Sequence, residues 1–164
     1  MALIRLNNQS LTNVTALPAA IPTGKVLQVV NASVTAKDTV NITSAGVYQN
    51  TSLNLNITPS SASSKILITG SFIYGNAGGN LPARLRIDRG GTAITSGLGH
   101  MTYVGNGESE MGTCGVSVLD APATTSQLTY TVQITRDGTG NCYFNGNYYQ
   151  SGSESFLTAI EIAS

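Results

Sequence analysis

The residues best suited to chemistry gather in one glycine-rich stretch, residues 90–112, which holds the single histidine of the chain. His100 is followed there by Glu108 and Glu110. One imidazole and two carboxylates are a ligand set that could hold a divalent metal ion. A loop histidine beside two solvating acids explains the same pattern without a metal, and we favour that interpretation. We therefore predict no metal site and no cofactor.

Motifs for catalysis are weak throughout the sequence. There is no Gly-x-Ser-x-Gly elbow, and no helical pattern follows the glycine pairs at Gly97 and Gly105, so neither is predicted to bind phosphate. A pair of acids could serve a glycosidase, and four carboxylates lie at predicted strand ends and turns: Asp88, Asp120, Asp137 and Glu154. Such enzymes usually need a long aromatic-lined cleft, and the chain has no Trp. We expect no enzyme and no catalytic residue.

Tyrosines in Asn- and Gly-rich stretches are better candidates for binding. Tyr103, Tyr143, Tyr148 and Tyr149 lie in or beside such stretches. Tyrosines among Asn, Ser and Gly can bind sugars or proteins by stacking and hydrogen bonding. The same side chains could instead cover the end of a β-structure as amphipathic core residues, and both interpretations stay open. The candidate exposed ligand loop comprises His100, Tyr103, Tyr148 and Tyr149.

Composition limits the class of protein. With 164 residues, the chain has room for one domain and at most an appendage. Charged residues make up 10%, against a usual value of about 25%, and the net charge is zero, which argues against nucleic acid or an anionic membrane as a partner. The opening residues MALIRLNNQ lack the apolar run of a secretion signal, and no segment approaches the roughly 20 apolar residues of a membrane span.

The two cysteines, Cys114 and Cys142, both fall in strand-like runs. A disulfide between neighbouring strands is geometrically possible. We favour the alternative that both are small buried residues of a chain folded in a reducing cytoplasm.

Short alternating runs dominate the chain from residue 25 onward. They predict eight to ten strands and no helix, which indicates an all-β fold, most simply an antiparallel jelly-roll β-sandwich, with an up-and-down barrel as the alternative. Asp137-Gly138 predicts a hairpin. The predicted strands are Lys25–Val30, Thr39–Thr43, Thr51–Thr58, Lys65–Tyr74, Ala83–Arg89, Thr113–Leu119, Gln127–Thr135, Asn141–Tyr149 and Glu154–Ala163, with short strands at best in residues 90–112.

Residues 1–24 differ from the rest of the chain. They carry one charge, Arg5, and their apolar residues follow no regular period, while Pro18 and Pro22 exclude a continuous helix or central strand near the end of the segment. The segment could be disordered, could wrap its own domain, or could be an arm that lies on another protein. We favour the arm, with the jelly-roll domain spanning residues 25–164.

The last predicted strand is apolar on both faces. One face holds Phe156, Ile160 and Ile162, which we expect to join a core that includes Leu53, Ile66, Val116 and Val132. The other face holds Leu157, Ala159 and Glu161 and is the candidate contact with a neighbouring copy of the chain.

Three stretches carry a resemblance to a known family. They are NITPSSASSKILITGSF (56–72), LDAPATTSQLTYTVQI (119–134) and the terminal SFLTAIEIAS. In order and spacing they resemble the jelly-roll head domain that closes many tailed-bacteriophage fibre and fibre-like virion proteins. The opening LIRLNNQSLTNVTALP is similar to the leader of small phage structural proteins. The resemblance implies a homotrimer of eight-stranded jelly rolls with a structural or adhesive role and no cofactor.

The chain departs from a long tail fibre because it has no heptads, no collagen-like period and no β-helix repeats. This favours a trimeric capsid decoration or cement protein, made in the host bacterial cytoplasm and located in the virion. Its arm would attach to the major capsid protein or another virion protein through Leu3, Ile4, Leu6, Leu11, Val14 and Leu17, and its trimer contact would be Leu157, Ala159 and Glu161. The alternative is a short tail-fibre tip that binds a host receptor or surface glycan. A glycan hydrolase is the least favoured hypothesis.

Overall fold

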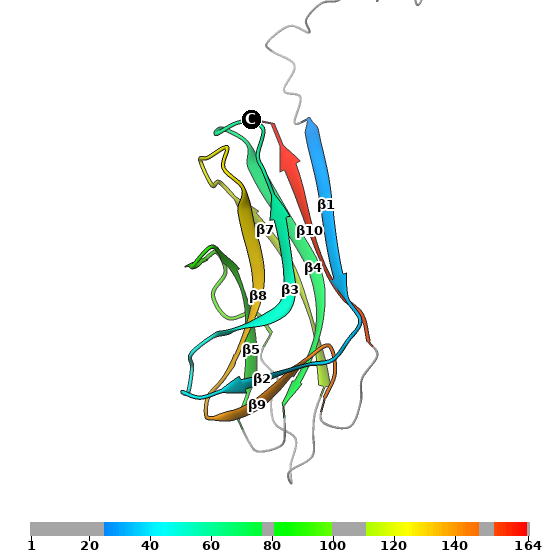
Figure 1. The fold of residues 1–164 in the computed structure, drawn as a ribbon, viewed down its shortest axis with the longest axis vertical. Helices are drawn as coiled ribbons and strands as arrows, with labels where there is room; N and C mark the ends of the chain where they lie inside the picture. Colours follow the sequence, from blue (N-terminus) through cyan, green and yellow to red (C-terminus); the bar gives the residue numbers. More distant parts are fainter. Residues whose placement is uncertain (1–24, 77–80, 100–110, 148–152, 164) are drawn as a thin grey trace, which may run out of the picture.

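Residues 25–76, 81–99, 111–147 and 153–163 are described by a computed structural model. They form ten β-strands in two antiparallel sheets that pack face to face (Figure 1). The predicted all-β sandwich is confirmed. Among the described residues, no helix is long and apolar enough to cross a membrane.

The observed strands agree closely with the predicted ones. In chain order they are β1 (Val26–Val34), β2 (Asp38–Ile42), β3 (Gln49–Ile57), β4 (Lys65–Asn76), β5 (Ala83–Arg89), β6 (Thr92–Ala93), β7 (Met111–Asp120), β8 (Leu128–Arg136), β9 (Gly140–Phe144) and β10 (Ser155–Ile162). The ninth strand ends earlier than predicted, because Asn145 adopts a left-handed backbone conformation with φ of 61°.

The sheet order is that of a jelly roll. Sheet A contains β1, β10, β4 and β7 side by side, and sheet B contains β3, β8, β5 and β6. This pair of four-stranded sheets is the arrangement of an eight-stranded, two-Greek-key jelly roll. The remaining pair, β2 and β9, extends sheet A beyond β10, where β9 pairs with the last residues of β4.

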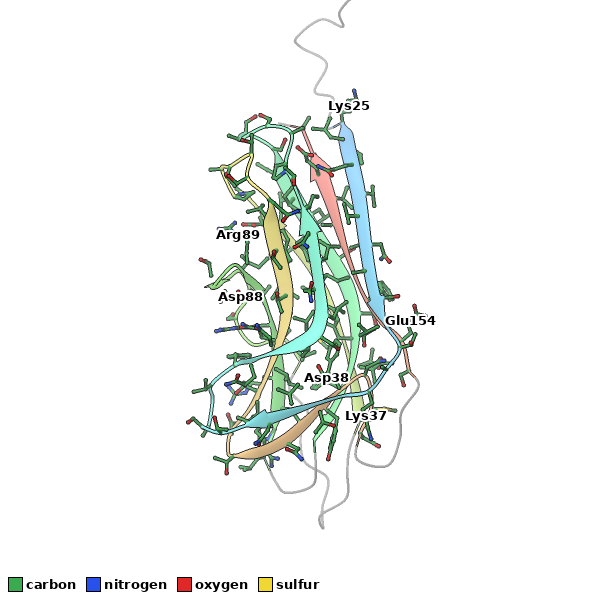
Figure 2. All side chains as sticks on the ribbon, in the orientation of Figure 1. Lys25, Lys37, Asp38, Asp88, Arg89 and Glu154 are labelled. Atoms are coloured by element: carbon green, nitrogen blue, oxygen red, sulfur yellow. The ribbon has the colours of Figure 1, made fainter. Side chains whose placement is uncertain are left out.

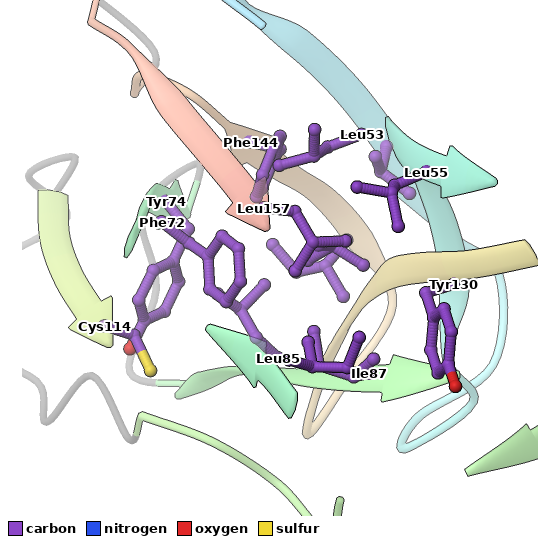
Figure 3. Close-up of a cluster of buried hydrophobic side chains, with 14 of the residues drawn as sticks. Leu53, Leu55, Phe72, Tyr74, Leu85, Ile87, Cys114, Tyr130, Phe144 and Leu157 are labelled. Carbon is purple, nitrogen blue, oxygen red and sulfur yellow. The ribbon is translucent and has the colours of Figure 1, made fainter. Parts of the chain in front are cut away.

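The strands form where apolar and polar residues alternate. In β3, Leu53, Leu55 and Ile57 are buried, whereas Asn54 and Asn56 are exposed, as the period of two predicts. The buried faces of both sheets meet in one core (Figure 3).

The packing at the centre of the core depends on one glycine, Gly70. Phe72 and Phe144 pack with ring centroids 6.3 Å apart. A Cβ atom added to Gly70 would lie 2.8 Å from the Phe72 ring and 2.7 Å from the backbone oxygen of Phe156. Gly70 therefore lets the Phe72 ring and the neighbouring strand approach β4 closely.

The predicted hairpin at Asp137-Gly138 is wrong. This turn joins β8 of sheet B to β9 of sheet A, which do not pair with each other. The backbone N–H of Asp137 instead donates to the Pro82 carbonyl, 3.3 Å away. The turn residues of a link between two sheets resemble those of a hairpin, so local sequence did not distinguish the two.

The facing predicted for the last strand is also wrong. Leu157, Ala159 and Glu161 point into the sandwich and are fully buried, and Leu157 lies among the core side chains in Figure 3. Phe156 points outward and is 43% exposed. Three of the four predicted core partners, Leu53, Ile66 and Val132, are buried, and Val116 is partly buried against the core.

Candidate functional site

Most of the predicted site residues fall outside the described part of the chain. This holds for the arm residues Leu3, Ile4, Leu6, Leu11, Val14 and Leu17, for the ligand-loop residues His100, Tyr103, Tyr148 and Tyr149, and for Glu108 and Glu110. The structure does describe residues beside these segments. Their positions show at which end of the sandwich each segment joins it.

The sandwich has two distinct ends, which β4 connects. Its 12 residues at about 3.3 Å each separate Lys65 from Asn76 by roughly 36 Å. Lys25, which follows the predicted arm, lies at the first end, where its carbonyl accepts a hydrogen bond from the Ala163 N–H at 2.9 Å. Figure 2 shows Lys25 at the end opposite Lys37, and Figure 1, in the same orientation, shows β2 and β9 at that opposite end. We name the Lys25 end the arm pole and the Asn76 end the far pole.

Residues that flank the predicted ligand loop lie at the far pole. Met111, which follows residues 100–110, is in register with Gly75 near the end of β4. The Asn145 side chain, three residues before Tyr148, donates to the carbonyl of Ser153. The described residue that follows the first predicted ligand segment and the described residues on both sides of the second therefore lie at the same end of the sandwich.

The arm pole is fastened by the buried carboxylate of Glu161. Its Oε1 accepts hydrogen bonds from the backbone N–H and the hydroxyl of Ser60, both at 2.7 Å, and its Oε2 accepts one from Gln28 Nε2 at 2.6 Å. A register shift between Val26 and Gln28 accompanies the inward turn of Gln28. Burial raises the pKa of Glu161, but the hydrogen bonds from Gln28 and Ser60 outweigh it and lower that pKa to about 2.

A second polar cluster joins the two sheets on the side of β7. The Asp120 carboxylate accepts hydrogen bonds from Arg89 and from the Tyr130 hydroxyl, the latter at 2.6 Å. Burial and the hydrogen bond to Asp120 raise the pKa of Tyr130, so the phenol stays protonated. Each of these three groups has a partner within the fold, which indicates a structural role.

Asn145 organises the far pole. Its side-chain N–H groups donate to the carbonyls of Val34, Ala36 and Ser153, and its Oδ1 accepts from Ser155 Oγ at 3.1 Å. Asparagine tolerates the left-handed conformation found here better than most residues do. One buried side chain thus ties the end of β9 to the β1–β2 connection and to the start of β10.

Other residues considered for binding or catalysis have partners in the fold. Tyr143 is buried, with the Lys37 ammonium 5.4 Å from its ring centroid, which matches the core interpretation for this tyrosine. Asp137 pairs with Arg84. Asp88 accepts a hydrogen bond from the Gly91 N–H at 2.7 Å and so holds the β5–β6 turn.

The described segments contain no group of three His, Cys, Asp or Glu residues placed to hold a metal ion, and no pocket of ligand size. Cys114 and Cys142 are free and buried, in agreement with the favoured interpretation. Burial raises the pKa of both thiols, that of Cys142 to about 11 although Arg136 opposes the shift, so both stay protonated.

The surface that sequence analysis missed is the outer face of sheet A. Val29, Ile160, Leu67 and Leu119 are consecutive cross-strand partners on β1, β10, β4 and β7. We name these four residues the apolar row. Val29 and Leu119 are 59% and 52% exposed. The signal is present in the sequence, because β4 and β10 are apolar on both faces, but this pattern alone does not determine which face turns inward.

Comparisons with known proteins assign the chain to no family. No family model and no curated protein matches the chain. Solved structures that resemble it include two of infectious bursal disease virus, the Gt strain (12% identity, TM-score 0.43, covering 85% of this chain and 39% of that one) and the Gx strain (14%, 0.43, 85% and 38%). A third is the VP2 subviral particle of the same virus (12%, 0.41, 91% and 42%). The chain spans about two fifths of the length of these structures. Its jelly-roll assignment rests on its own strand order, and the resemblance to tailed-phage proteins stays a prediction.

Proposed function

We propose that this chain is a non-enzymatic structural protein of a tailed-phage virion, a homotrimeric decoration or cement protein that residues 1–24 attach to the particle. The observation that carries the proposal is the separation of the two poles. The predicted arm joins the sandwich at the arm pole, and the predicted ligand segments join it at the far pole, roughly 36 Å away. A protein anchored by one end presents the other end to the surroundings.

The arm would supply the attachment energy. Its apolar residues, Leu3, Ile4, Leu6, Leu11, Val14 and Leu17, would bury surface against the shell at about 25 cal/mol per Å². Three arms on one trimer would bind with an avidity well above that of a single arm. The major capsid protein is the partner we propose.

The contacts of the carboxylates favour a structural role over an enzyme. Asp120 is held by Arg89 and Tyr130, and Glu161 by Ser60 and Gln28. A catalytic acid or base must be able to reach a substrate, whereas these groups connect strands inside the sandwich.

A receptor-binding tail-fibre tip is the second candidate function, and the far pole favours it. Met111, Asn145 and Ser153, which flank the predicted ligand segments, lie there. His100, Tyr103, Tyr148 and Tyr149 would then bind a host surface glycan. Loss of saturable envelope binding in Tyr148→Ala and Tyr149→Ala variants, with the protein located at the tail, would favour this function over decoration.

Reconstitution on particles tests the attachment. Purified wild type, a variant lacking residues 1–24, and the full-length variant Leu6→Asp/Leu11→Asp/Val14→Asp are added to particles stripped of the protein. Both altered proteins should give the far-ultraviolet circular dichroism of a β-sandwich and should fail to join the particles. The matched control, Ser10→Ala/Thr12→Ala, should bind as wild type does. Full occupancy by the Asp variant would contradict the proposed role of the arm.

A further inference from the structure

We propose that the outer face of sheet A is the surface through which copies of this chain contact one another. The inference rests on the proposed function for the number of copies, three, and replaces the contact predicted from Leu157, Ala159 and Glu161. Those three side chains are buried inside a single chain, so they cannot supply the contact without unfolding β10.

The first argument is the distribution of apolar side chains on β10. The inward face carries Ser155, Leu157, Ala159 and Glu161, whereas the outward face carries Phe156, Thr158, Ile160 and Ile162. A strand usually turns its more apolar face toward the core. Here the more apolar face points away from the core, which fits a strand that is covered on both sides.

The second argument is the continuity of the surface. The apolar row crosses all four strands of the jelly-roll half of sheet A without a polar interruption. The next row is neutral and hydroxyl-rich: Asn31, Thr158, Thr69 and Ser117 are cross-strand partners, and Asn31 donates to Thr158 at 2.9 Å. Both rows can be desolvated without burying a charge.

The third argument identifies the partner as a second copy. The strands β1, β4, β7 and β10 contain three charged residues, Lys65, Asp120 and Glu161. Asp120 and Glu161 are engaged inside the fold, so Lys65, at the arm-pole edge, is the charged group left to point outward. A partner that offered mainly charge would find no complement here, whereas the same face of a second copy, turned toward a shared three-fold axis, brings no like charge against it.

The size of the face suits such a contact. Four strands at about 4.8 Å spacing, over about eight residues at about 3.3 Å, give a flat area on the order of 500 Å². The side chains that stand on it add accessible surface. The total is of the same order as the roughly 800 Å² that each partner contributes to a stable interface.

The other outer face shows that this surface is not simply a product of composition. On sheet B, Gln133 donates to Asn50 at 2.7 Å and accepts from Arg86 Nε at 2.7 Å, and Thr129 donates to Asn56 at 2.7 Å. These polar side chains suit a hydrated surface and form hydrogen bonds with one another. One chain therefore carries a hydrated outer face and an apolar one, and the apolar one is the face we assign to contacts between copies.

Sedimentation velocity of full-length variants at micromolar concentration tests the proposal. Ile160→Glu and Leu119→Glu each place a carboxylate in the apolar row, and Leu119 lies on an edge strand where the lone chain tolerates the change. Both should sediment as folded monomers, with the association constant lowered at least ~100-fold. The control Asn54→Glu, on the outer face of sheet B, should keep the wild-type mass.

The outcomes separate the proposals. Wild-type mass for Leu119→Glu, or an equal loss of association in Asn54→Glu, would overturn the assignment of this face. So would loss of association in Leu6→Asp/Leu11→Asp/Val14→Asp with Leu119→Glu unaffected, because the arm would then be the contact. A wild-type monomer would overturn both this inference and the proposed trimer. A protein that associates through this face but is absent from particles would overturn the proposed function alone.

Discussion

The two outer faces of the sandwich differ although both belong to antiparallel sheets of similar length. On sheet B, cross-strand hydrogen bonds link Asn50, Gln133 and Arg86 side by side, so polar groups satisfy one another and the solvent. On sheet A, the corresponding positions carry the apolar row. Because the same backbone architecture tolerates both surfaces, we attribute the difference to what each face meets outside the chain. The outer face of sheet B is suited to contact with water, and the outer face of sheet A to contact with another protein surface.

The largest expected effect separates the inner and outer faces of β10. Leu157→Ala should lower the free energy of unfolding by about 3 kcal/mol, because it opens a cavity in the core. Phe156→Ala, one residue away on the outer face, should lower it by less than about 1 kcal/mol in the monomer and should weaken association instead. Urea denaturation and sedimentation of both variants measure the two effects. Equal losses of stability would contradict the observed facing.

Two glycines on neighbouring strands provide a similar contrast. Gly70→Ala should cost about 2 kcal/mol, because the new methyl group would meet the Phe72 ring and a backbone oxygen in the core. Gly115→Ala on β7 has only the Gly70 oxygen within reach, at 3.8 Å. It should be neutral or slightly stabilising. Thermal unfolding monitored by circular dichroism compares them, and a tolerated Gly70→Ala would show that the core is looser than described.

The buried Glu161 predicts a pH dependence. Its pKa is about 2 in the folded chain, against an ordinary value of 4.5, so its ionised form stabilises the fold above about pH 4.5. That contribution is lost as the pH falls from 4.5 toward 2. This difference in pKa corresponds to a loss of about 3 kcal/mol.

The variant Glu161→Gln isolates this effect. It should flatten the fall in stability between neutral pH and about pH 3, measured by urea denaturation, because the amide does not titrate in this range. Glu154→Gln, an exposed site that precedes β10, is the matched control and should keep the wild-type slope. An unchanged slope in Glu161→Gln would show that other carboxylates set the acid response.

The smallest expected effect lies on the outer face of sheet B. Gln133→Ala removes the hydrogen bonds to Asn50 and Arg86 and should cost up to about 1 kcal/mol. Association should not change. Any loss of association in this variant would contradict the claim that copies associate through the outer face of sheet A and not through that of sheet B.

Much of the fold was predictable because it depends on local patterns. Alternation in β3 and β5 and the turn residues between strands placed most strand boundaries within a few residues. The hairpin at Asp137-Gly138 was not predictable, because a turn within a sheet and a turn between sheets use the same residues. Which apolar face of β10 turns inward was not predictable either, since Glu161 is accommodated by Ser60 and Gln28, which are distant in sequence.

The candidate site was harder to predict from the sequence than the fold. The arm and ligand-loop residues are predicted from composition and lie outside the described residues, so they stay predictions. The apolar row could not be recognised before the strand register was known, because Val29, Ile160, Leu67 and Leu119 are spread over four strands. Each of these residues is unremarkable in its own strand, and only their pairing makes a surface.

The most direct test of the account is an electron cryo-microscopy reconstruction of the phage particle at a resolution that shows individual strands. We predict a jelly-roll density in groups of three on the shell. In each copy Lys25 and the arm pole should face the capsid, β2 and β9 should point outward, and the outer face of sheet A should be turned toward neighbouring copies. A sandwich found with its far pole against the shell, or missing from the particle altogether, would contradict it.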